Sequence, residues 1–267
     1  MERSMIAGKS ESKDVDLVMF MGQSNMAGRG TAADAPSVPS GYGFEFRAIS
    51  DPTRLYPITE PFGVNENNEI SGVFESTKTG SMISSFAIAY YSIAGRPIVG
   101  VSCSKGGTSI NLWQPGVAFL NDAIARFQEA MSWLTANGYT IKNKFMVWCQ
   151  GETDGDNGMT RADYTARLKA MINGMAEAGI ERCYVVRIGN HRDDARLYQP
   201  IMQAQTELCD TYETAILVSS KFAEMAAAGL MKDPFHYTQA GYNRTGADAG
   251  MNTALHIVSR NRDNITT

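Results

Sequence analysis

The sequence predicts an α/β fold in which helices cover both faces of a central parallel β-sheet. Continuous apolar runs of strand length recur along the 267 residues, and such runs are typical of strands buried on both faces. Segments with helical apolar spacing separate these runs, which is the pattern of βαβ units. Because no linker, shift in composition or internal repeat interrupts the alternation, we expect a single domain over residues 1–267.

The first predicted strand covers residues 17–21 and ends at Gly22. Residues 22–28 follow it as a turn and the start of a helix. The polar residues 1–15 before the strand are expected to form a flexible N-terminal tail. Residues 31–80 hold five of the nine prolines together with many Gly and Asn residues. We therefore expect an irregular excursion there, which decorates one face of the domain.

The alternation becomes regular after the excursion. Apolar side chains at helical spacing predict a helix over residues 118–136, which ends at an Asn-Gly pair. The other predicted helices cover residues 82–94, 161–178, 195–212 with a bend at Pro200, and 238–260, and the other predicted strands cover residues 97–103, 144–149, 183–188 and 215–219.

A functional site is expected at one edge of this sheet. Active sites of open parallel sheets lie beyond the carboxyl ends of the strands. Four stretches take that position, and polar residues and glycines concentrate in all of them: residues 22–28, 104–109, 149–155 and 189–194. We therefore search these stretches first for chemistry.

The composition excludes several classes of function. A net charge of −4 argues against a nucleic-acid partner, which would favour a basic surface. No apolar run approaches the ~18 residues of a membrane span. The four cysteines form no C-x-x-C pair and no His–carboxylate cluster has ligand spacing, so we expect buried free thiols and no metal.

The sequence leaves compartment and assembly open. No apolar stretch of signal-peptide length begins it. Two expectations follow, a cytoplasmic protein or a secreted one whose signal has been removed. No pattern indicates an oligomeric state.

Ser24 is the candidate nucleophile. It lies in the turn after the first predicted strand, between Gly22 and the small residues Ala27 and Gly28. A serine in that position can equally be the N-cap of the next helix. The turn is not the G-x-S-x-G elbow of α/β-hydrolases, because Met26 replaces the second glycine.

The general base that activates the nucleophile must be one of the three histidines of the chain. Asp233, three residues before His236, can accept a hydrogen bond from Nδ1 across a turn and leave Nε2 free to take a proton. The alternative is an ordinary Asp-Pro turn with a solvated histidine. His191, which follows a predicted strand, is the second choice of base. His256, inside a predicted helix, is expected to be a packing or surface residue.

Two strand-end stretches offer hydrogen bonds to an oxyanion. The backbone N–H groups of the Gly106–Gly107 turn can bind one, although a simple loop is the common alternative. Gln150 can add its side-chain amide. Glu152 and Asp154 can organise their loop, bind substrate hydroxyls or simply be solvated.

Motifs of other enzyme classes fail on position or order. Gly28-x-Gly30 imitates a dinucleotide fingerprint but does not directly follow the strand, as that fingerprint must. Ser102-x-x-Lys105 and Lys78-Thr79-Gly80 echo penicillin-binding enzymes, but in inverted order and without Ser-Asp-Asn.

Four sequence blocks resemble those of the SGNH hydrolases, and most closely the sialate O-acetylesterase-like and acetylxylan-esterase branch, carbohydrate esterase family six. The blocks are FMGQSNM at 20–26, SKGGTS at 104–109, QGETD at 150–154 and Asp233-x-x-His236. They occur in the order of the family, and the first and third together are a specific pair.

This resemblance implies a flavodoxin-like three-layer α/β/α sandwich. It also implies hydrolysis of acetyl esters on sugars, of the acetylated-xylan or sialic-acid type, through an acyl-enzyme and without a cofactor. Ser24 takes the role of nucleophile, His236 that of base and Asp233 that of its orienting acid.

The resemblance also assigns the oxyanion donors. The donors are the backbone N–H groups of Ser24 and of Gly107 or Gly106, and the side chain of Gln150, which stands where many SGNH enzymes carry Asn. Residues expected to bind substrate or to organise the loops are Gln23, Asn25, Asn111, Trp113, Glu152 and Asp154. Asn111 and Trp113 are candidates for a sugar platform, although a core position for Trp113 is about as plausible.

Two alternative functions remain open from the sequence. A non-catalytic carbohydrate-binding module on the same fold would not need Ser24, Asp233 or His236. A lipase or thioesterase would need an apolar groove, and the excursion at 31–80 is too polar to suggest one. The expected partner is an acetylated carbohydrate, with no nucleic acid and no membrane.

Overall fold

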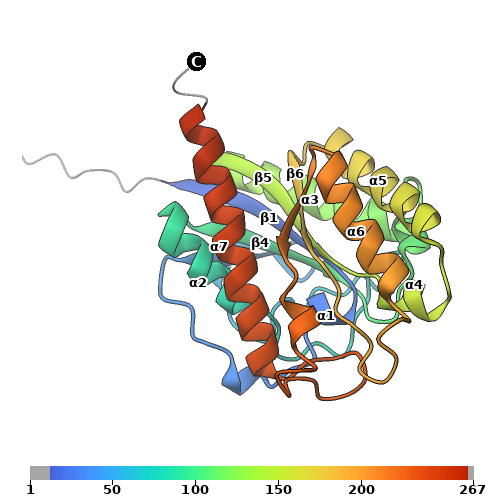
Figure 1. The fold of residues 1–267 in the computed structure, drawn as a ribbon. Helices are drawn as coiled ribbons and strands as arrows, with labels where there is room; N and C mark the ends of the chain where they lie inside the picture. The colour runs from blue at the N-terminus through green and yellow to red at the C-terminus, as the bar shows by residue number, and fades with distance from the viewer. Residues whose placement is uncertain (1–12, 264–267) are drawn as a thin grey trace, which may run out of the picture.

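A seven-stranded sheet forms the centre of the computed structural model, which describes residues 13–263 (Figure 1). Its strands are β1 (Asp14–Gly22), β2 (Gly43–Arg47), β3 (Asp51–Pro57), β4 (Ile98–Ser104), β5 (Thr140–Cys149), β6 (Arg182–Val186) and β7 (Ala215–Ser219). They lie in the order β3-β2-β4-β1-β5-β6-β7. Each neighbouring pair is parallel except β2 and β3, which are antiparallel.

Helices form a layer on each face of this sheet (Figure 1). Helices α2 (Ile83–Ala94) and α7 (Gln239–Asp263) pack together on one face, and α3 (Ala118–Ala136), α5 (Arg161–Glu177) and α6 (Gln199–Thr211) cover the other. The shorter helical segments are α1 (Ser24–Ala27), α4 (Glu152–Asp156), η1 (Ala32–Asp34), η2 (Ile110–Trp113) and η3 (Lys221–Glu224). The three-layer α/β/α fold is therefore confirmed.

Strand β1 shows why the sequence has unbroken apolar runs. Successive side chains of a strand point to opposite faces of the sheet. Leu17 and Met19 join the core with residues of α3, α5 and α6, whereas Val18 and Phe20 join the core with residues of α2 and α7. Because both faces are covered, successive positions from Leu17 to Met21 all carry apolar side chains.

The five predicted strands correspond to β1, β4, β5, β6 and β7. Taken alone, they lie in the order β4-β1-β5-β6-β7, which is the doubly wound order 2-1-3-4-5 of flavodoxin-like sheets. Strand β1 therefore has β4 on one side and β5 on the other. The loops that follow these three strands consequently meet at one edge of the sheet.

The excursion at 31–80 differs from the prediction, because it is not irregular throughout. Its residues 43–57 form β2 and β3, which extend the sheet beyond β4. Pro52 and Pro57 lie in β3 at the sheet edge, where a missing N–H costs no ladder hydrogen bond. The prolines that suggested a loop are therefore compatible with an edge strand.

Two further boundaries differ. Strand β1 begins at Asp14, within the range predicted as a tail, and residues 1–12 of that range lie outside the described residues. Helix α6 begins at Gln199 and carries Pro200 in its first turn. Since proline is well tolerated there, Pro200 starts this helix and does not bend it.

The cysteines agree with the expectation of free thiols. Cys103, Cys149 and Cys183 are buried and unbridged, and Cys209 is half-buried and also free. Within residues 13–263, the structure contains no helix with both the length and the apolar character needed to cross a membrane.

Candidate active site

A cavity of ≈310 Å³ lies beyond the carboxyl ends of β1, β4 and β5. It is lined by six residues that the sequence singled out, namely Gln23, Ser24, Gly106, Gly107, Glu152 and His236. The loops after three different strands therefore converge on one site, as the sheet topology requires.

The turn after β1 (residues 22–28, the β1 turn) is fixed by its two neighbouring strands. Gly22 has a φ of +141°, and a Cβ there would lie 2.0 Å from the carbonyl oxygen of Cys149. The backbone N–H of Gln23 donates to that same oxygen at 3.0 Å, and the N–H of Lys105 donates to the Gly22 oxygen at 2.9 Å. Only glycine fits this close approach.

Ser24 is the first residue of α1, and the N-cap of that helix is Gln23. The Ser24 side chain therefore does not cap the helix. Its hydroxyl lies 2.9 Å from Nε2 of His236, although 212 positions separate the two residues.

His236 in turn lies against Asp233. Its Nδ1 is 2.8 Å from Oδ2 of Asp233, while Oδ1 accepts the backbone N–H groups of Phe235 at 3.0 Å and of His236 at 2.7 Å. With the ring proton on Nδ1, the imidazole donates to Asp233 and accepts the Ser24 hydroxyl at Nε2. This is the hydrogen-bond arrangement of a Ser-His-Asp constellation.

The electrostatics of the pair suit this proton arrangement. Burial raises the pKa of Asp233, but the hydrogen bonds from Phe235 and His236 outweigh it and hold the pKa below its ordinary value. Burial lowers the pKa of His236, against the opposing effect of Asp233. Asp233 is therefore ionised and His236 neutral near pH 7.

The loop that carries these two residues (231–237, the histidine loop) is held at three points. The Lys232 N–H donates to the His236 oxygen at 3.0 Å within the loop. The Arg192 N–H donates to the Pro234 oxygen at 2.8 Å, and the Asn25 amide donates to the Phe235 oxygen at 3.0 Å. The stretch at 189–194 thus supports the histidine loop from outside the cavity.

The other two histidines lie elsewhere. Nδ1 of His191 accepts the backbone N–H groups of Asp193 and Asp194 at 3.3 and 3.1 Å, so it contacts its own loop. His256 lies in α7 with Nδ1 3.0 Å from the Tyr184 hydroxyl, in agreement with a packing role. Among the described residues, His236 is the histidine that lines the cavity.

The glycine turn (residues 105–107) follows β4 and offers one amide to the cavity. The Gly106 N–H donates to Oε2 of Glu75 at 2.6 Å. The Gly107 N–H has no hydrogen-bond partner among residues 13–263, and Gly107 has a φ of +67°, in the region that favours glycine. Of the two amides that the sequence left open, the Gly107 N–H is therefore the one without a partner among the described residues.

Gln150 is a correction to the expected oxyanion donors. Its side chain is fully buried, and its two amide protons are taken by the Thr108 oxygen at 2.8 Å and by Asp154 at 2.5 Å. Its Oε1 accepts the Tyr164 hydroxyl at 3.0 Å. The Gln150 amide therefore braces the loops beneath the cavity and has no proton left for an oxyanion.

Asp154 organises the same loops. It is fully buried, and besides Gln150 it accepts the Ser109 hydroxyl at 2.5 Å and the Ile110 N–H at 2.9 Å. Of the three possibilities that the sequence left open for Asp154, the contacts match the organising role.

Glu152 and Asn25 form a buried polar pair next to the cavity. Nδ2 of Asn25 donates to Oε1 of Glu152 at 2.5 Å, and Oδ1 of Asn25 accepts the Tyr242 hydroxyl at 2.7 Å. Oε2 of Glu152 has no hydrogen-bond partner among the described residues. Burial raises the pKa of Glu152 to about 7, against the opposing hydrogen bond from Asn25.

Gln23 lies at the junction of two strand-end loops. Its Oε1 accepts the Gly151 N–H at 3.1 Å, and its Nε2 lies 3.4 Å from the Thr153 hydroxyl. Gln23 therefore joins the β1 turn to the loop after β5 while it also lines the cavity.

Of the two positions that the sequence left open for Trp113, a sugar platform or the core, the structure shows the core. Trp113 is completely buried, with its indole 5.5 Å from that of Trp148 and its Nε1–H on the Thr108 hydroxyl at 3.2 Å. Asn111 is exposed but does not line the cavity. The large apolar side chain at the cavity is Phe235, which is 37% exposed and lies 4.5 Å from the His236 ring.

Sequence reasoning also missed a charged wall of the cavity. Arg29, Glu75 and Thr77 line it, and Arg29 and Glu75 form an ion pair of 2.9 Å. Two of the three belong to the excursion, where the sequence shows no motif or strand end. The one available signal was the position of Arg29 directly after the β1 turn.

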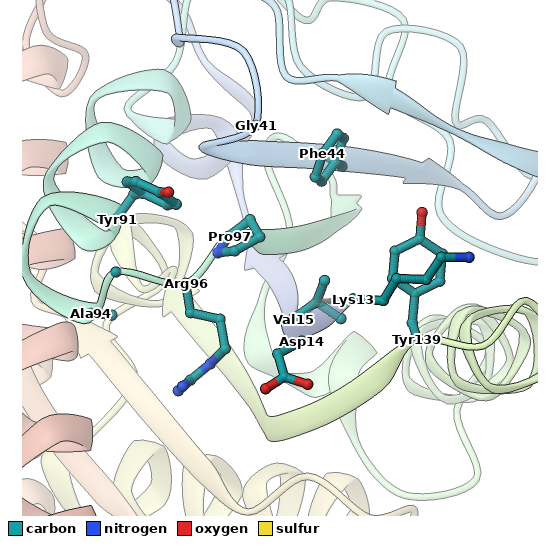
Figure 2. Close-up of a pocket in the computed structure, with 11 residues that line it drawn as sticks. Lys13, Asp14, Val15, Gly41, Phe44, Tyr91, Ala94, Arg96, Pro97 and Tyr139 are labelled. Carbon is teal, nitrogen blue, oxygen red and sulfur yellow. The ribbon is translucent and has the colours of Figure 1, made fainter. Parts of the chain in front are cut away.

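A larger cavity, of ≈790 Å³, lies at the opposite edge of the sheet. Figure 2 shows it between the start of β1 and the end of α2, with Phe44, Tyr91 and Tyr139 around Lys13 and Arg96. No serine, cysteine or histidine lines it. Across residues 13–263, no three His, Cys, Asp or Glu side chains gather where they could hold a metal ion.

Comparison with known families gives a match over most of the chain. The family described as "Carbohydrate esterase, sialic acid-specific acetylesterase" matches residues 14–253. No curated protein sequence matches the chain significantly.

Several solved structures have a fold similar to that of this chain. A protein from Arabidopsis thaliana is 20% identical, with a TM-score of 0.68 over 93% of this chain and 98% of its own. NanS is 13% identical, with a TM-score of 0.65 over 93% and 99%. A carbohydrate acetylesterase from Xanthomonas citri is 18% identical, with a TM-score of 0.52 over 90% of this chain and 55% of its own.

Proposed function

The chain belongs to the carbohydrate esterase family of sialic acid-specific acetylesterases and is a carbohydrate O-acetylesterase, and from this premise we propose that Ser24, His236 and Asp233 are its catalytic triad. The family match confirms the resemblance of the four sequence blocks. The observation that carries the proposal is the unbroken chain of hydrogen bonds from Ser24 Oγ through His236 to Asp233, at 2.9 and 2.8 Å.

In the proposed reaction, Ser24 Oγ attacks the acetyl carbonyl while His236 Nε2 takes its proton. The oxyanion accepts hydrogen bonds from the backbone N–H groups of Ser24 and Gly107. The bond between the acetyl carbon and the sugar oxygen then breaks while His236 protonates that oxygen, so the sugar leaves with a free hydroxyl and Ser24 carries the acetyl group. Water, deprotonated by His236, attacks this ester and releases acetate. Loss of one oxyanion donor should cost ~3 kcal/mol of transition-state stabilisation.

The lining of the cavity favours a sugar over a lipid substrate. Among its described residues, Phe235 is the single large apolar side chain, and charged or hydrogen-bonding groups make up most of the rest. A lipase or thioesterase would need an apolar groove for the acyl chain. A binding module would not need a serine hydroxyl bonded to a histidine, so both alternatives are less well supported.

We propose an O-acetylated sialic acid as the preferred substrate, because the family description names this sugar. Acetate release from acetylated sialic acid, acetylated xylan and small acetylated sugars, compared side by side, tests this choice. A clear preference for acetylated xylan would overturn the substrate and leave the reaction class intact.

Replacement of Ser24 tests the triad. Ser24→Ala should lower acetate release by about 10⁴-fold or more, and leave the melting temperature nearly unchanged. A serine-reactive phosphonate should label Ser24 in the natural protein and nothing in this variant. His191→Ala is the matched control for His236→Ala, because His191 lies outside the cavity. Full activity of Ser24→Ala, or a dead His191→Ala beside an active His236→Ala, would refute the assignment.

A further inference from the structure

The carboxylate of Glu75 is the point where the excursion meets the catalytic loops. Glu75 is 2% exposed and accepts four hydrogen bonds. Its Oε1 takes the Thr77 N–H at 2.9 Å and the Thr77 hydroxyl at 2.6 Å, and its Oε2 takes Nη2 of Arg29 at 2.9 Å and the Gly106 N–H at 2.6 Å. These bonds outweigh burial and lower its pKa to about 2.

Arg29 connects the Glu75 carboxylate to the β1 turn, which contains Ser24. It directly follows Gly28, the C-cap of α1, and its Nη1 donates to the Gly28 oxygen at 2.8 Å and the Thr77 oxygen at 3.0 Å. Backbone hydrogen bonds of 2.8 and 3.2 Å between Gly30 and Gly80 extend the contact. Residues 75–80 are therefore paired with the chain that leaves the β1 turn.

The Glu75 carboxylate also fixes the glycine turn. Because Oε2 of Glu75 holds the Gly106 N–H, that amide is turned to the excursion and only the next amide, at Gly107, is left for the cavity. A Cβ at Gly106 would lie 2.8 Å from Oε2 of Glu75 and 3.5 Å from Cβ of Ser24. Gly106 thus lies close to both Glu75 and Ser24.

We propose that Glu75 is a positioning residue for the esterase reaction, which orients the Gly107 N–H toward the oxyanion and, through Arg29, fixes its distance from the Ser24 N–H. One ionised oxygen joins the two turns that supply these donors. Oxyanion stabilisation depends on donors that are already in place. Segment 75–77 of the excursion is therefore part of the catalytic machinery. This inference rests on the proposed function of Ser24 and Gly107.

The variant Glu75→Gln tests this role. It keeps the size of the side chain, but an amide has only one acceptor oxygen and carries no charge, so it cannot accept the two hydrogen bonds from Thr77 together with those from Gly106 and Arg29. A misplaced donor should lower kcat by about 10- to 100-fold, with KM within about threefold because ground-state contacts to the sugar remain. Labelling of Ser24 by a phosphonate, whose oxygen occupies the same site, should slow by a similar factor.

Glu66→Gln is the matched control. Glu66 is a second buried glutamate of the excursion, 1% exposed, and it accepts the N–H groups of Ile49 and Ser50 and the Ser50 hydroxyl. It should lose comparable thermal stability and keep kcat. Glu75→Asp, which cannot reach both Thr77 and the glycine turn, decides the question if Glu75→Gln does not fold, and it should show the same loss of kcat.

The outcomes separate this inference from the proposed function. A Glu75→Gln protein with natural kcat, or one whose kcat falls only as far as that of Glu66→Gln, would overturn the positioning role while Ser24 labelling stands. Unlabelled Ser24 in the natural protein would instead overturn the triad itself.

Discussion

The cavity has two walls that are held by different forces. The β1 turn and the glycine turn follow buried parallel strands, and backbone hydrogen bonds from Gln23 to Cys149 and from Lys105 to Gly22 fix them. The wall from the excursion is held by one backbone bridge, between Gly30 and Gly80, and by buried charged side chains that bind backbone groups. The first wall therefore inherits its geometry from the sheet, whereas the second depends on individual side chains.

Arg126 of α3 is the main support of the second wall. Its side chain is 1% exposed and pairs with Asp122 at 2.8 Å. Its guanidinium donates to the oxygens of Glu66 at 3.0 Å, Ser102 at 2.8 Å and Val73 at 3.2 Å. One arginine thus fastens two points of the excursion to β4. The comparison teaches that a segment without apolar periodicity can still be firmly held.

Loss of Arg126 should break the second wall and gives the largest expected effect. Arg126→Met leaves the Asp122 carboxylate buried without its cation and removes the arginine donor from three carbonyl oxygens. Breaking a buried pair in this way costs about 3–5 kcal/mol, measured as the free energy of unfolding in urea. Acetylesterase activity should fall as well, because Glu75 loses its support.

The control for Arg126 is an exposed pair of the same excursion. Arg54, 68% exposed, pairs with Asp51 on β3, and Arg54→Met should leave stability and activity nearly unchanged. Equal losses from the two variants would show that the position of the excursion does not depend on the buried pair.

The two walls also differ in how far the sequence could predict them. Ser24, Gly107 and His236 stand at strand ends or in a short-range motif, so local pattern sufficed to find them. Glu75 and Arg29 are 46 positions apart and meet through polar contacts, which leave no periodic signal. The apolar runs predicted five strands of the sheet, but they missed β3, an edge strand with two prolines and no continuous apolar run.

Gln150 and Trp113 show a second limit. Residue type and strand-end position were right for Gln150, yet the direction of its amide depends on Asp154 and Thr108, and no local pattern contains that information. Trp113 likewise packs against Trp148 from a different strand. The chemical groups of a side chain can be read from the sequence, but the direction in which the side chain points is set by tertiary contacts.

Glu152 offers a test of the first wall, with the second-largest expected effect. Its buried Oε2 lacks a partner among the described residues, and its pKa rises from 4.5 to about 7. The native protein therefore binds more protons than the unfolded chain between these two values. Stability falls as the pH rises through that window and does not return above it.

Glu152→Gln removes this cost and keeps an oxygen for the Asn25 amide. The variant should be more stable than the natural protein by about 1–3 kcal/mol at pH 8, with a smaller difference at pH 5. Urea unfolding at the two pH values measures both. A variant that is less stable at pH 8 would mean that the carboxylate is satisfied and that the first wall carries no such strain.

Lys78 offers a test of the excursion wall, and its expected effect on stability is smaller. Its side chain is buried against β4, with Nζ on the Ser102 hydroxyl. Burial, and next the charge of Arg126, lower its pKa from 10.5 to about 8. Between these values the unfolded chain binds more protons than the native protein, so this lysine makes stability rise with pH across the window.

Lys78→Met should abolish that rise. Between pH 7.5 and 9.5 the natural protein should gain about 1–2 kcal/mol relative to the variant, measured by urea unfolding, whereas Lys142→Met, at an exposed lysine of β5, should keep the natural slope. Equal slopes in the natural protein and Lys78→Met would mean that the buried amine keeps its proton. The charges of Glu45 and Glu75, which favour the protonated form of Lys78, would then offset the cost of burying the ammonium group. Lys78 would, like Arg126, be one member of a buried network of paired charges.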